Sequence, residues 1–207
     1  MEDVLDLYEQ PYDARRPVIA IDERPCQLIG DVLVPIAMKP GKPQRYDYEY
    51  ERHGVCTVFI AVEALTGRRL VQVRARRTQS EYTEFMQTVS TIWAEAECIR
   101  IVQDNLNTHT PGSFYTRLAP EEAFALAQRF EMHYTPKKAS WLNMAEIELS
   151  ALSKQCLDRR IATQEQLTRE VEAWAEQRNH DQVKITWRFT KNDARTKLQR
   201  HYDAVHN

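Results

Sequence analysis

The sequence predicts an α/β protein in which helices cover a mixed β-sheet. Two continuous apolar runs, 17–22 and 98–104, each end on an aspartate and are typical of strands buried on both faces. Strand-like segments occupy the first half of the chain, and strands alternate with helical segments in the second half, which indicates helices packed on a sheet. With 207 residues, of which 43% are hydrophobic, the chain can bury a core without disulfide bonds.

Three strands are expected in the first half of the chain. The first is the run 17–22, and the second and third are 55–65 and 69–77, joined by Thr66-Gly67-Arg68 as a hairpin turn. Between the first two strands, residues 24–50 contain four of the nine prolines and two of the five glycines. An irregular excursion or a loose hairpin is therefore expected over 24–50.

Apolar residues at helical spacing alternate with shorter strand-like runs in the second half. A helix with Ser80 as its N-cap is expected ahead of the strand 98–104. The last helix is expected to be capped by Thr190 and Asp193. The other expected elements are helices over 80–96, 120–130, 143–158, 163–179 and 190–202 and a short strand over 131–135.

Composition excludes several classes of protein. The 28 Lys and Arg residues against 30 Asp and Glu give a net charge of −2, which excludes a globally basic nucleic-acid-binding protein but not a local basic patch. No secretory signal or membrane-spanning run is evident, so a cytoplasmic protein without a membrane partner is expected. The cysteines lack metal-binding spacing and are expected to be buried thiols in a reducing compartment: Cys26, Cys56, Cys98 and Cys156.

The two strands that end on aspartates suggest a site at one edge of the sheet. If the strands are neighbours, Asp22 and Asp104 come together, and a divalent cation with oxygen ligands would relieve their repulsion. The alternative is that each aspartate only ends a strand at a turn.

A third acidic position lies where the helix 143–158 begins, after Ser140-Trp141-Leu142. Asn143 and Glu146 fit an N-cap with its N3 partner, a capping box that needs no catalysis. Helical phase does not choose between Glu146 and Glu148, because both flank the apolar side of the helix.

Taken together, these pieces resemble a known family. Ile-Asp-Glu at 21–23, Gln-Asp-Asn at 103–105 followed by His109, and Trp-Leu-Asn-x-x-Glu at 141–146 resemble the catalytic domain of DDE transposases. More narrowly, they are similar to the bacterial insertion-sequence branch related to the Tc1/mariner elements. The resemblance covers essentially the whole chain and implies a ribonuclease-H-like fold, a mixed five-stranded sheet flanked by helices.

The resemblance also assigns roles to residues. Asp22 matches the first catalytic aspartate, Asp104 the second and Glu146 the closing glutamate, so the resemblance selects Glu146 over Glu148. The chain departs from the family pattern in two places: 41 residues separate Asp104 from Glu146, and Lys138-Ala139 stands where relatives commonly have His-Gly. The first departure lengthens this part of the chain, and the second leaves the loop geometry open.

The resemblance implies metal-dependent cleavage of DNA and strand transfer, the chemistry by which an insertion sequence moves. Two Mg²⁺ or Mn²⁺ ions would be held by the three carboxylates, with Asp22 bridging and with Asp104 and Glu146 each completing one ion. The implied partners are the transposon ends and the target DNA. Relatives act as dimers, so a homodimer fits the resemblance, although no dimerisation element is evident in the sequence.

Other residues are candidates for supporting roles. Asn105, His109 and Asn143 are expected to orient the carboxylates, although His109 also fits an ordinary loop residue. Trp141 either packs beneath the helix of Glu146, the favoured option, or stacks on a base. The candidate DNA contacts, for which a solvated strand face is the equal alternative, are Arg74, Arg76, Arg77, Lys137, Lys138 and Trp141. Arg68 and Arg69 belong to the same basic run.

The expected organisation is a lead-in segment over 1–16 and a DDE catalytic domain with C-terminal helices over 17–207, with the upstream helix-turn-helix domain of the family absent. Three alternatives stay open. The chain could be a truncated, non-catalytic remnant that binds DNA or full-length transposase, or another ribonuclease-H-like nuclease that acts on RNA/DNA hybrids or Holliday junctions. It could also be an α/β protein with no role in nucleic-acid chemistry.

Overall fold

The computed structural model describes residues 1–137 and 139–200. Its strands are β1 (Val18–Asp31), β2 (Tyr50–Glu63), β3 (Arg68–Arg74), β4 (Ile99–Gln103) and β5 (Phe130–Tyr134). Its helices are α1 (Glu2–Glu9), α2 (Gln79–Ile92), α3 (Pro120–Ala127), α4 (Ala145–Gln155), α5 (Gln164–His180) and α6 (Lys191–Lys197), with short 3₁₀ helices η1 (Pro111–Thr116) and η2 (Ser140–Leu142). From β1 to α6, strands and helices follow the predicted order.

The strands form one mixed sheet of five, which confirms the predicted fold class. The strand order is β3-β2-β1-β4-β5. The first three strands are an antiparallel meander, and β4 and β5 then add in parallel beside β1. Gly67, at φ 78°, lies in the predicted turn between β2 and β3 and takes the left-handed conformation that glycine tolerates best.

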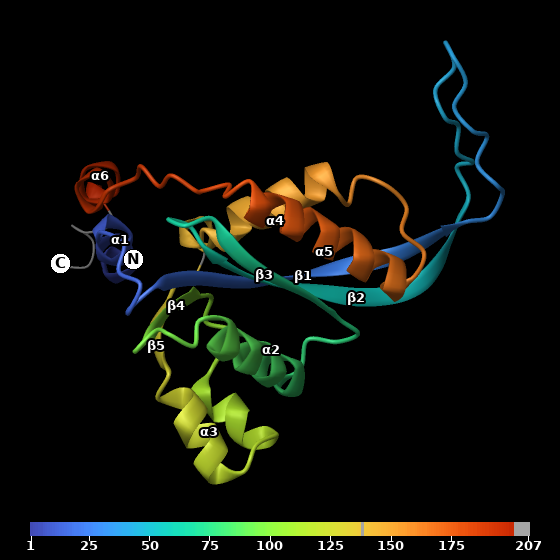
Figure 1. Cartoon of the computed structure of the whole chain (residues 1–207). Helices are drawn as coiled ribbons and strands as arrows, with labels where there is room; N and C mark the ends of the chain where they lie inside the picture. Colours follow the sequence, from blue (N-terminus) through green and yellow to red (C-terminus); the bar gives the residue numbers. More distant parts are fainter. Residues whose placement is uncertain (138, 201–207) are drawn as a thin grey trace.

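The first two strands are longer than predicted. Residues 24–50 were expected to form an irregular excursion or a loose hairpin, and the structure has a hairpin: the antiparallel ladder of β1 and β2 continues as far as Asp31 and Tyr50. Pro25 is accommodated because β4 pairs only with residues 18–20 of β1, so no strand needs its missing N–H on that side. Only residues 32–49 leave the sheet, and they form an exposed arm that projects from the body (Figure 1).

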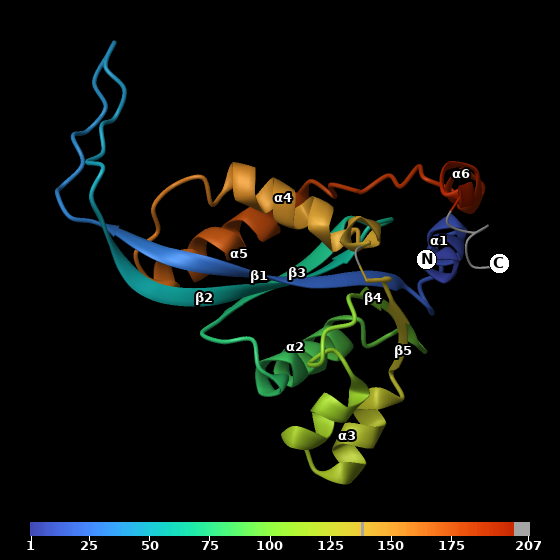
Figure 2. The ribbon, with the colours of Figure 1, turned by 180° about the vertical axis from the view of Figure 1, so that it is seen from behind.

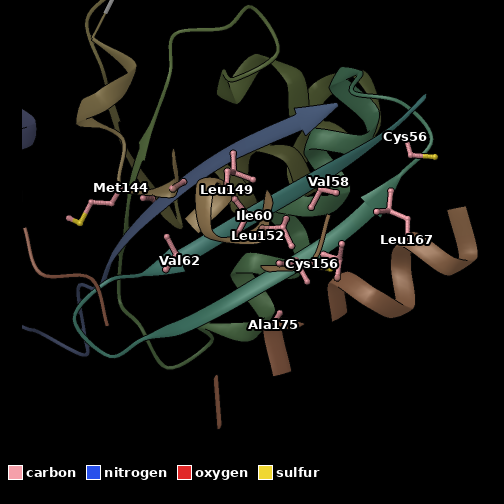
Figure 3. Packing of buried hydrophobic residues seen from close by; sticks show 14 of the residues in the cluster. Cys56, Val58, Ile60, Val62, Met144, Leu149, Leu152, Cys156, Leu167 and Ala175 are labelled. Carbon is pink, nitrogen blue, oxygen red and sulfur yellow. The ribbon is translucent and has the colours of Figure 1, made fainter. Parts of the chain in front are cut away.

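Helices cover both faces of the sheet in three layers (Figures 1 and 2). On one face, α4 and α5 bury β2 side chains such as Val58 and Ile60 against Leu149 and Leu152 (Figure 3). On the other face, α2 and α3 cover Ile21 and Phe59. Because side chains alternate along a strand, neighbouring residues of β1 serve opposite layers.

The capping predictions have mixed outcomes. Thr78, not Ser80, caps α2, because the Thr78 hydroxyl accepts the backbone N–H of Ser80 and the Glu81 carboxylate accepts the N–H of Thr78. The caps predicted at Thr190 and Asp193 are confirmed as a capping box at α6.

The four cysteines are free thiols, but the prediction that all are buried is only partly right. Cys56 and Cys156 lie in the core, whereas Cys26 and Cys98 are half-buried. None of the helices described is both long and apolar enough to cross a bilayer.

The first residues of the chain form a helix for which the sequence analysis assigned no element. Val4 and Leu5 of α1 are fully buried. Leu5 packs with Leu142 of η2 and Ala194 of α6, so α1 and α6 lie side by side at one end of the sheet (Figure 1).

Candidate active site

The register of the sheet brings Asp22 and Asp104 to the same level. In the parallel pair of β1 and β4, Ala20 is opposite Val102, and the two aspartates lie two residues beyond these partners. Since β4 ends at Gln103, Asp104 is the first residue past its strand, whereas Asp22 is still within β1. The two carboxylates therefore share one edge of the parallel region, as the sequence predicts.

Asp22 is held by two neighbours. Its Oδ1 accepts the backbone N–H of Glu23 at 2.8 Å, and the Asn143 side-chain amide lies 3.4 Å from its Oδ2. Burial raises the pKa of Asp22 to about 7, and the negative charges of Glu146, Glu23 and Asp104 add to this effect. The raised pKa thus comes first from burial, with a smaller contribution from the three neighbouring carboxylates.

Asn143 connects the start of α4 to β1. Its amide donates to the backbone oxygen of Ile21 at 2.8 Å, and its Oδ1 accepts the backbone N–H of Ala145 at 3.1 Å. The capping box of Asn143 and Glu146 is not formed, because α4 begins at Ala145 with Met144 at the N-cap and without a side-chain cap. Glu146 is instead exposed in the first turn of α4 and lines a hollow together with Asp22.

Glu146 and Glu148 lie in different environments. The Glu148 side chain is 1% exposed and forms ion pairs with Arg69 at 3.1 Å and Arg178 at 2.9 Å. Burial lowers the pKa of Arg69, although Glu148 opposes that effect. Glu148 therefore connects α4 to β3 and α5, and only Glu146 is free to face a ligand.

His109 forms a bridge between two carboxylates. Its Nδ1 lies 2.5 Å from Oδ1 of Asp104, and its Nε2 lies 2.9 Å from Oε2 of Glu23. Burial lowers the pKa of His109, but the hydrogen bonds and charges of Asp104 and Glu23 outweigh it and raise the pKa to about 9. In turn, the hydrogen bond from His109 lowers the pKa of Asp104. His109 is thus a charged group in the interior, not a solvated loop side chain.

The three carboxylates line two hollows. Asp22 and Glu146 line the first, and Asp104 lines the second with Asn105 and Lys137. Within residues 1–137 and 139–200, no three His, Cys, Asp or Glu side chains are grouped closely enough to hold one metal ion.

The basic residues predicted to contact DNA do not form one patch. Arg69 is buried, Arg68 lies over the Trp93 ring at 5.0 Å, and Arg74 is paired with Glu84. Arg76 and Arg77 are exposed in the loop after β3, and Arg68 is exposed where β3 begins. The charge of Arg77 lowers the pKa of Asp104, so Arg77 lies within electrostatic range of the site. Lys137 is exposed beside Asp104, and Lys138 lies outside the described residues.

Trp141 packs on aromatic rings outside α4. Its ring is stacked on Trp187 with centroids 6.3 Å apart and meets Phe189 edge-on at 5.3 Å. Trp141 was expected to pack beneath the helix of Glu146. Its ring contacts are instead with Trp187 and Phe189, in the segment before α6. Trp141 stays 46% exposed, and its role toward DNA stays a prediction.

Two features were not evident from the sequence: the position of Glu23 beside the site and the exposed apolar side chains of the arm 32–49. Glu23 was treated only as a polar neighbour of Asp22, yet strand alternation places it with Ile21 on the opposite face from Asp22, toward His109. In the arm 32–49, apolar side chains such as Val34 and Met38 are unusually exposed, which the sequence did not predict. The alternation of side chains along a strand could have predicted the position of Glu23. No local sequence pattern indicates that the apolar side chains of the arm are exposed.

Comparison with known proteins identifies a family. Residues 17–168 match the family described as DDE superfamily endonuclease. No curated protein matches the chain.

Solved transposase structures share the fold. The Mos1 mariner paired end complex with Mn is 13% identical, with a TM-score of 0.57, and the match covers 88% of this chain and 56% of that chain. The Mos1 strand transfer complex is also 13% identical over the same shares, with a TM-score of 0.56. This chain thus spans little more than half the length of those chains, and at such low identity the likeness concerns the fold.

Proposed function

This chain belongs to the DDE superfamily endonuclease family, and we propose that it is a transposase catalytic domain that cleaves DNA strands and joins them to target DNA with divalent metal ions. One observation carries the proposal. Asp22 and Glu146 line one hollow, and Asp104 stands level with Asp22 on the neighbouring strand. Three acidic side chains from β1, from the end of β4 and from α4 thus converge on one edge of the sheet.

The residues present suit a hard cation. Asp22, Asp104 and Glu146 offer carboxylate oxygens, the donors that Mg²⁺ and Mn²⁺ prefer. Burial raises the pKa of Asp22, and the nearby charges of Glu146, Glu23 and Asp104 raise it further, so a bound cation would favour the ionised form. We propose that Asp22, Asp104 and Glu146 would hold two ions, with Asp22 contributing to both and Asp104 and Glu146 to one each.

The protein's own residues would position the reactants. Asp22 is oriented by the Glu23 amide and by Asn143, Asp104 is oriented by His109, and Glu146 projects from the rigid first turn of α4. When bound, the two ions would lower the pKa of a water molecule and stabilise charge on the leaving oxygen. Hydrolysis of a phosphodiester at this site would form a bond from a water oxygen to phosphorus and break the bond from phosphorus to the 3′ oxygen. The water loses a proton and the 3′ oxygen gains one through solvent, which gives a 5′ phosphate and a 3′ hydroxyl.

Strand transfer would use the same site. The freed 3′ hydroxyl would take the place of water: its oxygen forms a new bond to a phosphorus of target DNA, and the bond from that phosphorus to the target's own 3′ oxygen breaks. The proton of the attacking hydroxyl is released to solvent, and the departing oxygen takes up a proton and becomes a new 3′ hydroxyl. Arg76, Arg77 and Lys137 would hold backbone phosphates beside the carboxylates, because all three are exposed and Arg77 and Lys137 lie near Asp104. Asn105 is exposed in the same hollow and would contact the bound phosphate.

We also propose a homodimer, for which the arm 32–49 is the candidate contact. The exposed apolar side chains concentrate there, with Val34 at 92% and Met38 at 73% exposure. Exposed apolar surface of this kind marks interaction sites in soluble proteins. A second copy of the chain would cover it when two DNA ends are paired.

DNA nicking tests the proposed function. Supercoiled plasmid is incubated with Mn²⁺ and the wild type or the variants Asp22→Asn, Asp104→Asn and Glu146→Gln, and the relaxed product is quantified. We expect each variant to lose at least about 100-fold in rate, because each removes a carboxylate that holds an ion. Glu95→Gln, at an exposed position before β4, serves as the control. Unchanged nicking by Asp104→Asn would contradict the proposal.

A substrate panel separates this function from that of a related nuclease. Duplex DNA, an RNA/DNA hybrid and a four-way junction are compared under the same conditions. We expect cleavage of duplex DNA and joining of a 3′ hydroxyl end to a second DNA molecule. Cleavage confined to the hybrid would contradict the transposase assignment.

A further inference from the structure

Glu23 is linked to both aspartates of the proposed site. Its backbone contacts Asp22, and its side chain contacts His109, which in turn contacts Asp104. We propose that Glu23 is a positioning residue that fixes Asp22 through its backbone and Asp104 through His109. This inference rests on the proposed function, because its consequence is the geometry of a metal site. Glu23 is not one of the three acidic residues that are proposed to hold the ions.

The first link is local. The backbone N–H of Glu23 donates to Oδ1 of Asp22 at 2.8 Å. This hydrogen bond restrains the Asp22 carboxylate, which Asn143 approaches from the start of α4. The backbone of β1 at Glu23 therefore helps to set where the first aspartate points.

The second link runs through the interior. Oε2 of Glu23 and Nε2 of His109 are 2.9 Å apart, and the two side chains are 4% and 2% exposed. Both atoms are enclosed, and neither has another hydrogen-bond partner among the described residues. A buried carboxylate without a partner is costly, so each group depends on the other.

His109 is held from other directions as well. Its ring is stacked on Tyr82 of α2 with centroids 4.9 Å apart. Its backbone oxygen accepts hydrogen bonds from Gln103 at 3.1 Å and from the Tyr134 hydroxyl at 3.0 Å. With the ring fixed in this way, Nδ1 can meet only a narrow range of Asp104 orientations, at 2.5 Å from Oδ1.

The arrangement couples two strands at the level of the proposed ions. Glu23 belongs to β1, and His109 lies in the loop that follows β4 and Asp104. Partners of this kind, which orient a ligating side chain without touching the metal, commonly change metal affinity by about 10- to 100-fold when removed. Glu23 would thus hold the two aspartates in a fixed mutual geometry.

Calorimetric titration of the full chain with Mn²⁺, without DNA, tests the inference. We expect Glu23→Gln to weaken Mn²⁺ binding by about 10- to 100-fold. Glu95→Gln removes the same charge at an exposed position before β4 and is expected to match the wild type. Thermal unfolding with a chelator shows whether each variant is folded at the titration temperature.

A double-mutant cycle separates positioning from simple loss of charge. His109→Asn keeps a donor near the place of Nδ1 but cannot reach Glu23. In that background, we expect Glu23→Gln to change Mn²⁺ affinity by less than about twofold, because the route through His109 is already broken. A through-space effect of charge would persist, and an undiminished loss in the double variant would overturn the inference.

The failures of the two proposals can be told apart. A wild type that binds no Mn²⁺ overturns the proposed function and this inference with it, whereas wild-type affinity in Glu23→Gln overturns only the inference. If Glu23→Gln does not fold, proton NMR of the wild type decides. A slowly exchanging Nε2 proton on His109 is expected, and its rapid exchange with solvent would exclude the bridge to Glu23.

Discussion

At the scale of single residues, folding places the Asp22 carboxylate where its ionised form is disfavoured. It is partly buried and feels the charges of three other carboxylates, so its pKa of about 7 in the folded state exceeds its ordinary value of 3.8. A raised pKa favours the protonated folded state, so the stability that Asp22 contributes is complete below about pH 4 and is lost as the pH rises through 7.

Asp22→Asn is therefore expected to stabilise the metal-free protein. Asparagine stays neutral, so the advantage of the variant should grow between about pH 4 and 7 and then level off at an order of 2 kcal/mol. Chemical denaturation in the presence of a chelator at pH 5 and pH 8 measures it. A larger advantage at pH 5 than at pH 8 would contradict the assigned direction of the pKa.

Two glutamates of α4 provide a matched pair. Glu148→Ala leaves Arg69 buried without its carboxylate and is expected to cost about 3–5 kcal/mol of unfolding free energy. Glu146→Ala, at an exposed position, should change stability by less than about 0.5 kcal/mol while nicking is lost. Urea denaturation and the nicking assay measure the two effects. Equal stability losses in the two variants would contradict these separate roles.

The sequence could predict the acidic residues better than their partners. Asp22 and Asp104 follow apolar runs, so their positions depend on local patterns, and Glu146 was chosen by resemblance to a family motif. The ion pair of Glu148 with Arg69 joins residues 79 positions apart, and that of Glu23 with His109 also depends on the folded sheet. Charge and spacing along the chain do not encode such long-range pairs.

At the scale of elements, the arm 32–49 is an extension of the β1–β2 hairpin. Pairing of β1 with β2 continues to Asp31 and Tyr50, and beyond them the isolated bridges Ile36–Arg45 and Lys39–Lys42 continue the pairing. The sequence suggested an irregular segment because Pro25 and the other prolines are poor strand formers. That preference was overridden by cross-strand partners that are distant in the sequence.

Shortening the arm should preserve the fold and remove self-association. Replacing residues 32–49 by Asn-Gly leaves Asp31 and Tyr50 to close a two-residue hairpin. We expect the melting temperature to change by only a few degrees, because the arm contributes little to the buried core. Sedimentation velocity with paired DNA ends should show dimers for the full chain and monomers for the shortened one. Dimers of the shortened chain would place the contact elsewhere.

The loop between β3 and α2 is the element expected to bind the DNA backbone. Arg77→Glu should lower DNA affinity and reduce the slope of log affinity against log salt by about 1, since one phosphate contact is lost. Arg169→Glu makes the same change at an exposed position on α5 and serves as control. Fluorescence anisotropy from 50 to 300 mM salt measures both. Equal slopes for the two variants would make Arg77 a bystander.

At the scale of the whole molecule, a mixed sheet flanked by helices could be predicted, but the closing of one end of the sheet could not. The periodicity of apolar residues predicts the main strands and helices between residues 17 and 200. The eight residues of α1 are too few to form a stable helix alone, and they are helical because Val4 and Leu5 are buried by distant segments. Ion pairs of Asp6 with Lys191 and of Glu2 with Arg195 then join α1 to α6.

The joining of α1 to the rest of the fold can be tested by one core substitution. Leu5 is fully buried against Leu142, which directly precedes Asn143, and against Ala194 of α6. Leu5→Ala should therefore cost about 2–5 kcal/mol of unfolding free energy and speed hydrogen exchange in α6. Leu65→Ala, at a position 45% exposed, should cost much less. If the two variants lose equal stability, and α6 exchanges in Leu5→Ala as slowly as in the wild type, then α1 does not contribute to closing this end of the molecule.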